Sequence, residues 1–226
     1  MKIDNSTQSS KPIRDTAYET LRHAIIGGDI PSGSRIVETD YAQRLHISRT
    51  PLREALRKLE RDGLIEYMPR RGVVVRAFTV EDVDEIYTIR NTLEMQTLPA
   101  IIKNATAEDI ARLRAILAKM DPLDAKGDIE SVSPLAREFH ARLTEISGLK
   151  RIILAIEGQD EYIRYFSAMA IAKEERRSDA HHEHHLLVDY VEQRDLESFS
   201  ILMQHHIERS RLACIAAMRD TGRYRE

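Results

Sequence analysis

Histidines are distributed unevenly along this chain of 226 residues. Seven of the nine lie in the second half, at positions 140, 181, 182, 184, 185, 205 and 206. Three converging imidazoles are a known coordination set for a transition metal. His184 and His206 fall on successive predicted helices that could face each other, and His140 could join them from a third helix. The alternative is that HHEHH and QHH are solvated or partly buried helix faces, and the residues alone leave both interpretations open.

A second group of residues with useful chemistry opens the segment ISRTPLREALRKL at positions 47–59. Its apolar residues recur at i, i+3, i+4 and i+7, which predicts one buried stripe on a helix: Leu52, Ala55, Leu56 and Leu59. Ser48 is suited to the N-cap, and Gly63 to the position after the C-cap. Burial of the stripe leaves these side chains pointing outward: Arg49, Thr50, Arg53 and Arg57. Since Arg bonds guanine edges bidentately, this helix suits a DNA major groove, and an ordinary solvated face is the alternative.

The segments around this helix predict a small DNA-binding unit. Helices are expected over 13–25, ending at Gly27-Gly28, and over 38–45. The β-prone runs 64–67 and 73–75 flank a Gly-containing turn, which predicts a hairpin. A helix-turn-helix followed by a hairpin is a winged helix. Arg70 and Arg71 at the tip would reach phosphate or the minor groove, unless the tip is only a solvated basic turn.

The remainder of the chain has helical periodicity and no strand pattern. We expect helices over 80–103, from 106 to a stop at Pro122, and over 134–147, 150–172, 179–193 and 195–219. The predicted fold is therefore mainly α, with an N-terminal winged helix-turn-helix and a C-terminal antiparallel all-α bundle of about six helices. The predicted parts are a disordered tail at 1–11, the DNA-binding domain at 12–76, a linker at 77–80 and the helical domain at 81–226.

Composition excludes several classes of protein. No apolar run is long enough to span a membrane, and the polar N-terminus has no secretory h-region. The single Cys214 excludes an internal disulfide framework and suits a reducing, cytoplasmic location. Residues 1–78 carry 14 Lys and Arg against 10 Asp and Glu, whereas the rest carries 20 against 27. This asymmetry indicates, weakly, that the first part meets a polyanion.

Residues 17–76 closely resemble the DNA-binding domain of the GntR family of bacterial transcription regulators. The motif SRTPLREAL, the following LERDGLI and the basic wing with RG carry the resemblance. His46 stands where the family usually has Gly, so we expect it at positive φ. The resemblance implies operator contacts by these residues, of which Thr39 is the weaker candidate: Thr39, Ser48, Arg49, Thr50, Arg53, Arg71 and Gly72.

Residues 80–220 resemble the FCD ligand-binding domain of the FadR subfamily, through IYTIRNTLE, EFHARLTEISG and the helix pair from EHHLL to QHHIERS. The resemblance implies a divalent metal, zinc or nickel, held by His140, His184 and His206. Ala136 occupies the position where metal-binding members usually have Asp or Asn, so the fourth protein ligand is missing.

The same resemblance implies a cavity for a small carboxylate. Arg90, on an otherwise apolar helix, is the expected effector-binding residue, and an ion pair with Glu94 on the next turn is the alternative. Tyr162 and Arg164 are further candidates, because they are polar residues on a mainly apolar helix.

These features predict a homodimeric regulator that binds an inverted repeat in double-stranded operator DNA. Family analogy suggests a repressor relieved by a metabolite and not an enzyme. The alternative function is that of an enzyme, a metal-dependent hydrolase that carries a DNA-binding domain. The pattern HHEHH argues against it, since Leu186 stands where the second His of HExxH would be.

Overall fold

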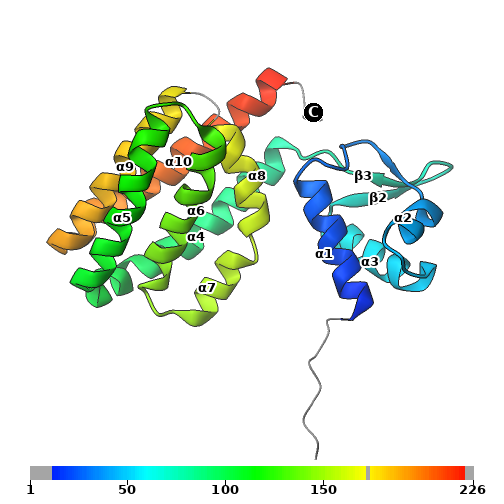
Figure 1. Cartoon of the computed structure of the whole chain (residues 1–226), viewed down its shortest axis with the longest axis horizontal. Helices are drawn as coiled ribbons and strands as arrows, with labels where there is room; N and C mark the ends of the chain where they lie inside the picture. The colour runs from blue at the N-terminus through cyan, green and yellow to red at the C-terminus, as the bar shows by residue number, and fades with distance from the viewer. Residues whose placement is uncertain (1–11, 172–173, 222–226) are drawn as a thin grey trace, which may run out of the picture. The chain divides into compact units, whose positions relative to one another are not determined.

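The computed structural model describes residues 12–171 and 174–221. The chain divides into two compact units, Met1–Ala77 and Phe78–Glu226. Figure 1 draws both units, and each is described here by itself. Among the described residues, no helix combines the length and apolarity that a membrane crossing requires.

The first unit is a winged helix, as predicted. Its elements are α1 (Ile13–Ile26), β1 (Arg35–Ile36), α2 (Glu38–Arg44), α3 (Arg49–Arg61), β2 (Ile65–Met68) and β3 (Gly72–Val75). The strands form an antiparallel sheet in the order β1-β3-β2, with Tyr67 opposite Val73 and Met68 opposite Gly72. The strand β1 was not predicted, because two residues are too few to produce an alternating pattern.

Helix α3 buries the predicted stripe, in which no side chain is more than 1% exposed. Ser48 occupies the N-cap, but its side chain makes no capping hydrogen bond. Gly63 follows the C-cap with φ of 71°, and His46 adopts φ of 53° in the turn before α3. Both left-handed positions agree with expectation, and the His46 backbone bears the strain that Gly would avoid.

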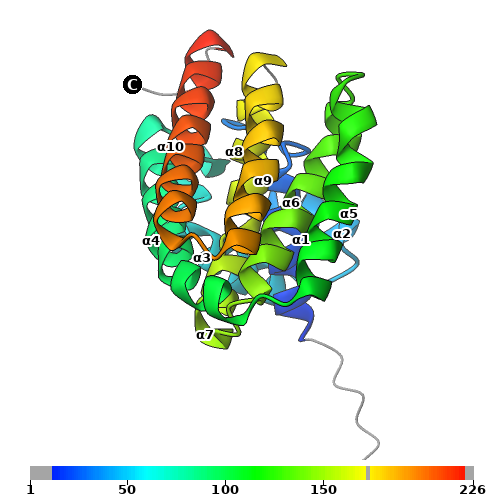
Figure 2. The same cartoon turned by 90° about the vertical axis from the view of Figure 1, so that its left-hand side faces the viewer.

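The second unit is an all-α bundle. Its described helices are α4 (Val80–Asn104), α5 (Ala107–Asp124), α6 (Ile129–Glu145), α7 (Lys150–Glu157), α8 (Asp160–Ala170), α9 (Glu174–Gln193) and α10 (Leu196–Thr221). Helix α5 packs against α6 and α9, and α10 packs against α4, α8 and α9. Figure 2 shows α5, α9 and α10 running alongside one another.

Several helix boundaries differ from the sequence expectation. Pro122 does not stop α5, since the helix is within its last turn there and ends at Asp124. Helix α6 begins at Ile129, before Pro134, because the Asp128 side chain caps it by accepting from the Ser131 amide. The expected single helix over 150–172 breaks between α7 and α8, around Gly158, which gives seven described helices rather than six.

The charged run 174–177 falls between the helices predicted over 150–172 and 179–193, but it forms the first turn of α9. Its two arginines are buried because both have carboxylate partners: Arg176 pairs with Glu183 and Arg177 with Asp124.

Phe78, inside the predicted linker, packs on the rings of Tyr162, Tyr165 and Phe166 in the second unit.

Candidate effector and DNA-binding sites

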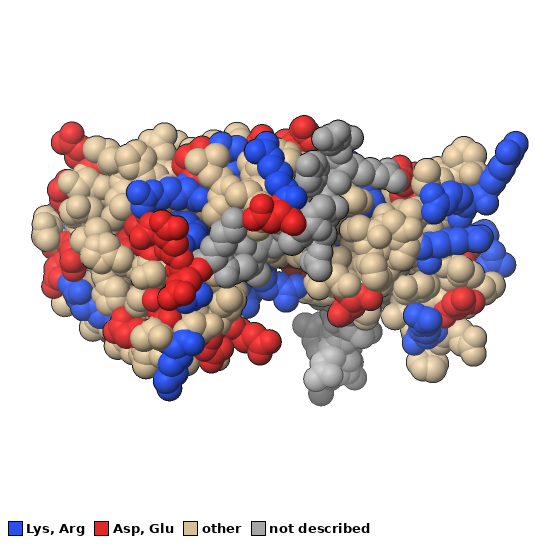
Figure 3. All heavy atoms as spheres, turned by 90° about the horizontal axis from the view of Figure 1, so that it is seen from above, with Lys and Arg blue, Asp and Glu red and all other residues tan. Residues whose placement is uncertain are grey.

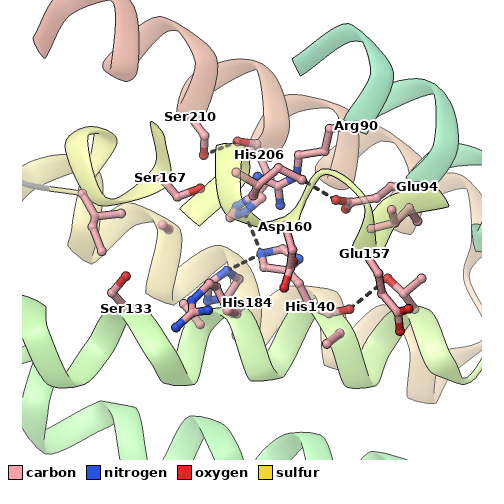
Figure 4. A pocket seen from close by; sticks show the side chains of 18 of the residues that line it. Arg90, Glu94, Ser133, His140, Glu157, Asp160, Ser167, His184, His206 and Ser210 are labelled. Atoms are coloured by element: carbon pink, nitrogen blue, oxygen red, sulfur yellow. Dashed lines mark hydrogen bonds and ion pairs between the residues drawn. The ribbon is translucent and has the colours of Figure 1, made fainter. Parts of the chain in front are cut away.

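Three histidines from three helices meet inside the second unit. His140 comes from α6, His184 from α9 and His206 from α10. The Nε2 atom of His140 lies 3.2 Å from the Nε2 atoms of both His184 and His206. Figure 4 shows the three imidazoles turned toward one another among the side chains that line the cavity. The spacing of the ligand atoms suits a metal ion, and the role of these residues as metal ligands stays a prediction.

Burial keeps these imidazoles neutral. It lowers the pKa of His140 and His184 well below the ordinary value, and the nearby positive charges of Arg90 and Arg176 add to the effect. Burial also lowers the pKa of His206, although the hydrogen bond to Glu183 opposes this shift. Neutral imidazole is the form that ligates metals.

A buried carboxylate orients His206. The Nδ1 atom of His206 lies 2.7 Å from Oε2 of Glu183. Burial raises the pKa of Glu183, but the hydrogen bond with His206 and the nearby positive charges outweigh it and lower the pKa to about 2. The ionised carboxylate can only accept, so Nδ1 of neutral His206 must donate and Nε2 presents its lone pair to the other imidazoles.

Two arginines hold Glu183 in place. Arg176 donates to Oε2 at 2.9 Å, and Arg209 donates to Oε1 at 2.8 Å. Arg176 also donates to the backbone oxygen of His206 at 3.1 Å and to Oγ of Ser210 at 2.9 Å. The carboxylate–histidine pair has the form of the outer-shell support found at metal sites. Sequence reasoning missed Glu183 and Arg176, and the only available signal was their charge on a helix that also carries inward-facing histidines.

The cavity beside the histidines has a volume of about 210 Å³. Arg90 lines it and is 4% exposed, and its Nε donates to Oε1 of Glu94 at 2.7 Å. Arg90 therefore combines both predicted roles, because it lines the cavity and also forms the ion pair with Glu94. Ala136 lines the cavity one turn before His140 and offers no ligand atom.

Arg137 is a lining residue that the sequence did not single out. Its Nε is buried with no hydrogen-bond partner among the described residues, so a ligand oxygen could satisfy it. Arg137 precedes His140 by three residues, which places both on one face of α6. The lining also includes exposed acidic residues, Glu157 and Asp160. Neither Tyr162 nor Arg164 is among the described lining residues, and the Tyr162 ring instead contacts Phe78.

All seven residues expected to contact DNA are exposed in the first unit. Thr39 lies on α2, Ser48 precedes α3, and Arg71 and Gly72 lie at the turn into β3. Lys and Arg side chains project from this unit in Figure 3. These positions present polar groups to solvent, and their contacts with bases or phosphates stay a prediction.

Glu38 links the two principal arginines of α3, which sequence reasoning did not foresee. Its Oε2 accepts from Arg53 Nε at 2.7 Å and from Arg49 at 3.2 Å. Burial raises the pKa of Glu38, but the hydrogen bonds from Arg53 and Arg49 outweigh it and lower the pKa. The carboxylate thus holds two exposed guanidinium groups side by side, one helical turn apart.

Comparison with known proteins identifies both units. Residues 13–75 match the gntR family of bacterial regulatory proteins, and residues 85–209 match the FCD domain. The transcriptional regulator YdhC of Bacillus subtilis, described as uncharacterized, is 29% identical over 182 residues, covering 80% of this chain and 81% of YdhC. The Nta operon transcriptional regulator of Aminobacter aminovorans is 33% identical over 156 residues, covering 68% of this chain and 71% of that protein.

The solved structure of McbR/YncC from Escherichia coli shares the fold. It matches with a TM-score of 0.69 and 22% identity, covering 94% of this chain and all of that one. These relatives are transcriptional regulators and not enzymes, so the hydrolase alternative has no support. The chain belongs to the gntR family of bacterial regulatory proteins, carries an FCD domain, and is a transcriptional regulator.

Proposed function

We propose that the protein is a homodimeric repressor of the FadR subfamily that releases an inverted-repeat operator when a small carboxylate enters its helical domain. Three histidine nitrogens directed at one point beside a cavity, inside the FCD domain of a transcriptional regulator, carry this proposal. A C2 dimer of winged helices matches the symmetry of an inverted repeat.

DNA recognition in this proposal depends on α3. Arg49 and Arg53 lie one turn apart, are more than half exposed, and share the carboxylate of Glu38. Arg bonds guanine O6 and N7 bidentately, so these residues read sequence. Thr39, Ser48, Thr50 and the wing residues position the domain on phosphates, which supplies affinity that falls with salt.

His140, His184 and His206 would hold the divalent ion, for which zinc and nickel are the candidates. Glu183 accepts the Nδ1 proton of His206, which leaves Nε2 of His206 free to bind the ion. Ala136 offers no ligand atom, so one coordination position has no protein ligand. A metal bound there supplies a Lewis-acidic position for a ligand oxygen.

Arg90 and Arg137 recognise the effector in this proposal. Arg90 uses Nε for Glu94, which leaves its terminal nitrogens for a carboxylate, and Arg137 offers a buried Nε. Charge-assisted bonds of this kind are the stronger class of hydrogen bond. Effector binding shifts the dimer between two arrangements of its DNA-binding domains, and such coupling is typically about 1–3 kcal/mol and reciprocal.

Operator release can be tested without knowing the effector. Double-stranded DNA selected from a random library by the purified protein serves as the operator, and fluorescence anisotropy gives its affinity. Acetate, succinate, citrate and an uncharged amide of each are then titrated into the complex. We expect at least one acid, and none of the amides, to weaken binding, and His140→Ala to abolish the response without changing affinity for DNA. An unchanged response in His140→Ala would exclude the histidine cluster as the sensor.

The direction of regulation needs a separate experiment. The selected operator is placed over a promoter driving a reporter gene, in cells with and without the protein. Repression predicts higher reporter expression without the protein, and lower expression would make it an activator.

A further inference from the structure

A second group of potential metal ligands lies between α5 and α9, outside the cavity lining. Asp121 comes from α5, and His181 and His185 come from α9. One oxygen of Asp121, Oδ1, lies 2.7 Å from Nε2 of His181 and 3.0 Å from Nε2 of His185. One potential ligand atom from each of the three residues therefore lies within 4.8 Å of the other two, which is close enough for all three to bind one metal ion.

We propose that Asp121, His181 and His185 form a second site for a late first-row divalent metal, separate from the cluster around His140. Two histidines at i and i+4 project from one face of a helix, so α9 presents both imidazoles in parallel. Two imidazoles and one carboxylate form a known facial ligand set that leaves positions open to water.

Solvent accessibility distinguishes this site, the outer site, from the inner cluster of His140, His184 and His206. The side chain of His181 is 12% exposed, that of His185 is 37% exposed, and that of Asp121 is 52% exposed. A hydrated ion can therefore reach the ligands from solvent. The inner cluster, by contrast, includes His184 and His206, which are each 3% exposed.

The free site needs little rearrangement to bind an ion. In the metal-free state both Nε2 atoms donate to the ionised Asp121 carboxylate, which fixes Nε2–H tautomers. Metal binding needs the Nε2 lone pairs, so each imidazole must then carry its proton on Nδ1, an atom that in His181 is buried with no hydrogen-bond partner among the described residues. The ion pair of Arg177 with Asp124, at 3.1 Å, holds the same two helices together nearby, so the ligands are already in place.

An ion at this site would bind α5 to α9, the helix that also carries His184. Because the ion binds the folded arrangement and not the separated helices, it stabilises the fold by RT ln(1 + c/Kd) at a free ion concentration c, so the melting temperature rises as the ion concentration increases above its dissociation constant. Affinity is expected to increase from nickel to copper and to fall again for zinc.

The experiment uses untagged full-length protein that has been stripped with a chelator and dialysed. Zinc and nickel are titrated separately by calorimetry into wild type, His181→Ala, Asp121→Asn and the matched control His182→Ala, an exposed histidine on the same helix. We expect His181→Ala to bind one ion fewer per chain than wild type and to lose part of the metal-induced thermal shift. Asp121→Asn keeps a hydrogen-bond acceptor and should fold normally but bind the outer ion more weakly, and His182→Ala should match wild type.

The same titration in His140→Ala tests the outer site separately from the histidine cluster proposed as the sensor. One ion should still bind, and adding His181→Ala should remove it. Equal stoichiometry and affinity in wild type and His181→Ala would overturn the proposal. An equal loss in His182→Ala would also overturn it, because binding would then be adventitious to surface histidines.

Discussion

Replacing Glu183 with Gln tests whether the buried carboxylate network controls the histidine cluster. The change removes the negative charge of a carboxylate whose oxygens accept hydrogen bonds from His206, Arg176 and Arg209. Gln keeps one oxygen acceptor but presents an NH2 group as well, so the Nδ1–H tautomer of His206 is no longer enforced. We therefore expect both metal affinity and stability to fall.

The size of each effect follows from the contacts. Loss of an outer-shell carboxylate typically costs about 10–100-fold in metal affinity. The side chain of Arg176 is only 9% exposed and loses its charged partner, although Ser210 and a backbone oxygen remain. Removing one partner of such a hydrogen bond costs about 1–3 kcal/mol, and each kcal/mol lowers the melting temperature by roughly 2–4 °C in a domain of this size.

The matched control is Glu192→Gln, the same substitution on the same helix. Glu192 is 53% exposed and pairs with Arg114, which also bonds Asp189. Exposed pairs contribute about 0–1 kcal/mol, so this variant should resemble wild type. Zinc titration by calorimetry and thermal unfolding followed by circular dichroism measure both effects. If Glu183→Gln and Glu192→Gln behave alike in both assays, the proposed role of Glu183 is refuted.

Three further substitutions test other parts of the molecule. Arg49→Ala should weaken specific DNA binding by about 1–3 kcal/mol and relax specificity at one base pair, measured by anisotropy on operator variants, with Arg61→Ala at the end of α3 as the control. Equal base preferences in the two variants would contradict the assignment. Ala136→Asp should tighten zinc binding, because it adds a carboxylate to the cavity one turn before His140; affinity that is unchanged or lower would place Ala136 outside ligand reach. Leu56→Ala should lower the free energy of unfolding of the first unit by about 2–5 kcal/mol, since Leu56 is fully buried, and a change below 1 kcal/mol in chemical denaturation would contradict this.

Some of the fold could be predicted because it depends on residues close together in the chain. The stripe from Leu52 to Leu59, the cap positions of Ser48 and Gly63, and the turn before Val73 each encode their structure within one or two turns. Helix boundaries were less predictable where two local signals competed. At Pro134 the proline suggested a helix start, but Asp128 capped the helix one and a half turns earlier.

The sequence by itself determined the winged helix, the helical nature of the second unit and the set of histidines available for binding, because helical period and residue type are local properties. Only the tertiary structure brought His140, His184 and His206 together, set Glu183 behind His206, and joined Arg49 and Arg53 through Glu38. It also placed Asp121 against His181 and His185. Each of these contacts joins different helices, and their distances depend on how whole helices pack rather than on the spacing of residues within one.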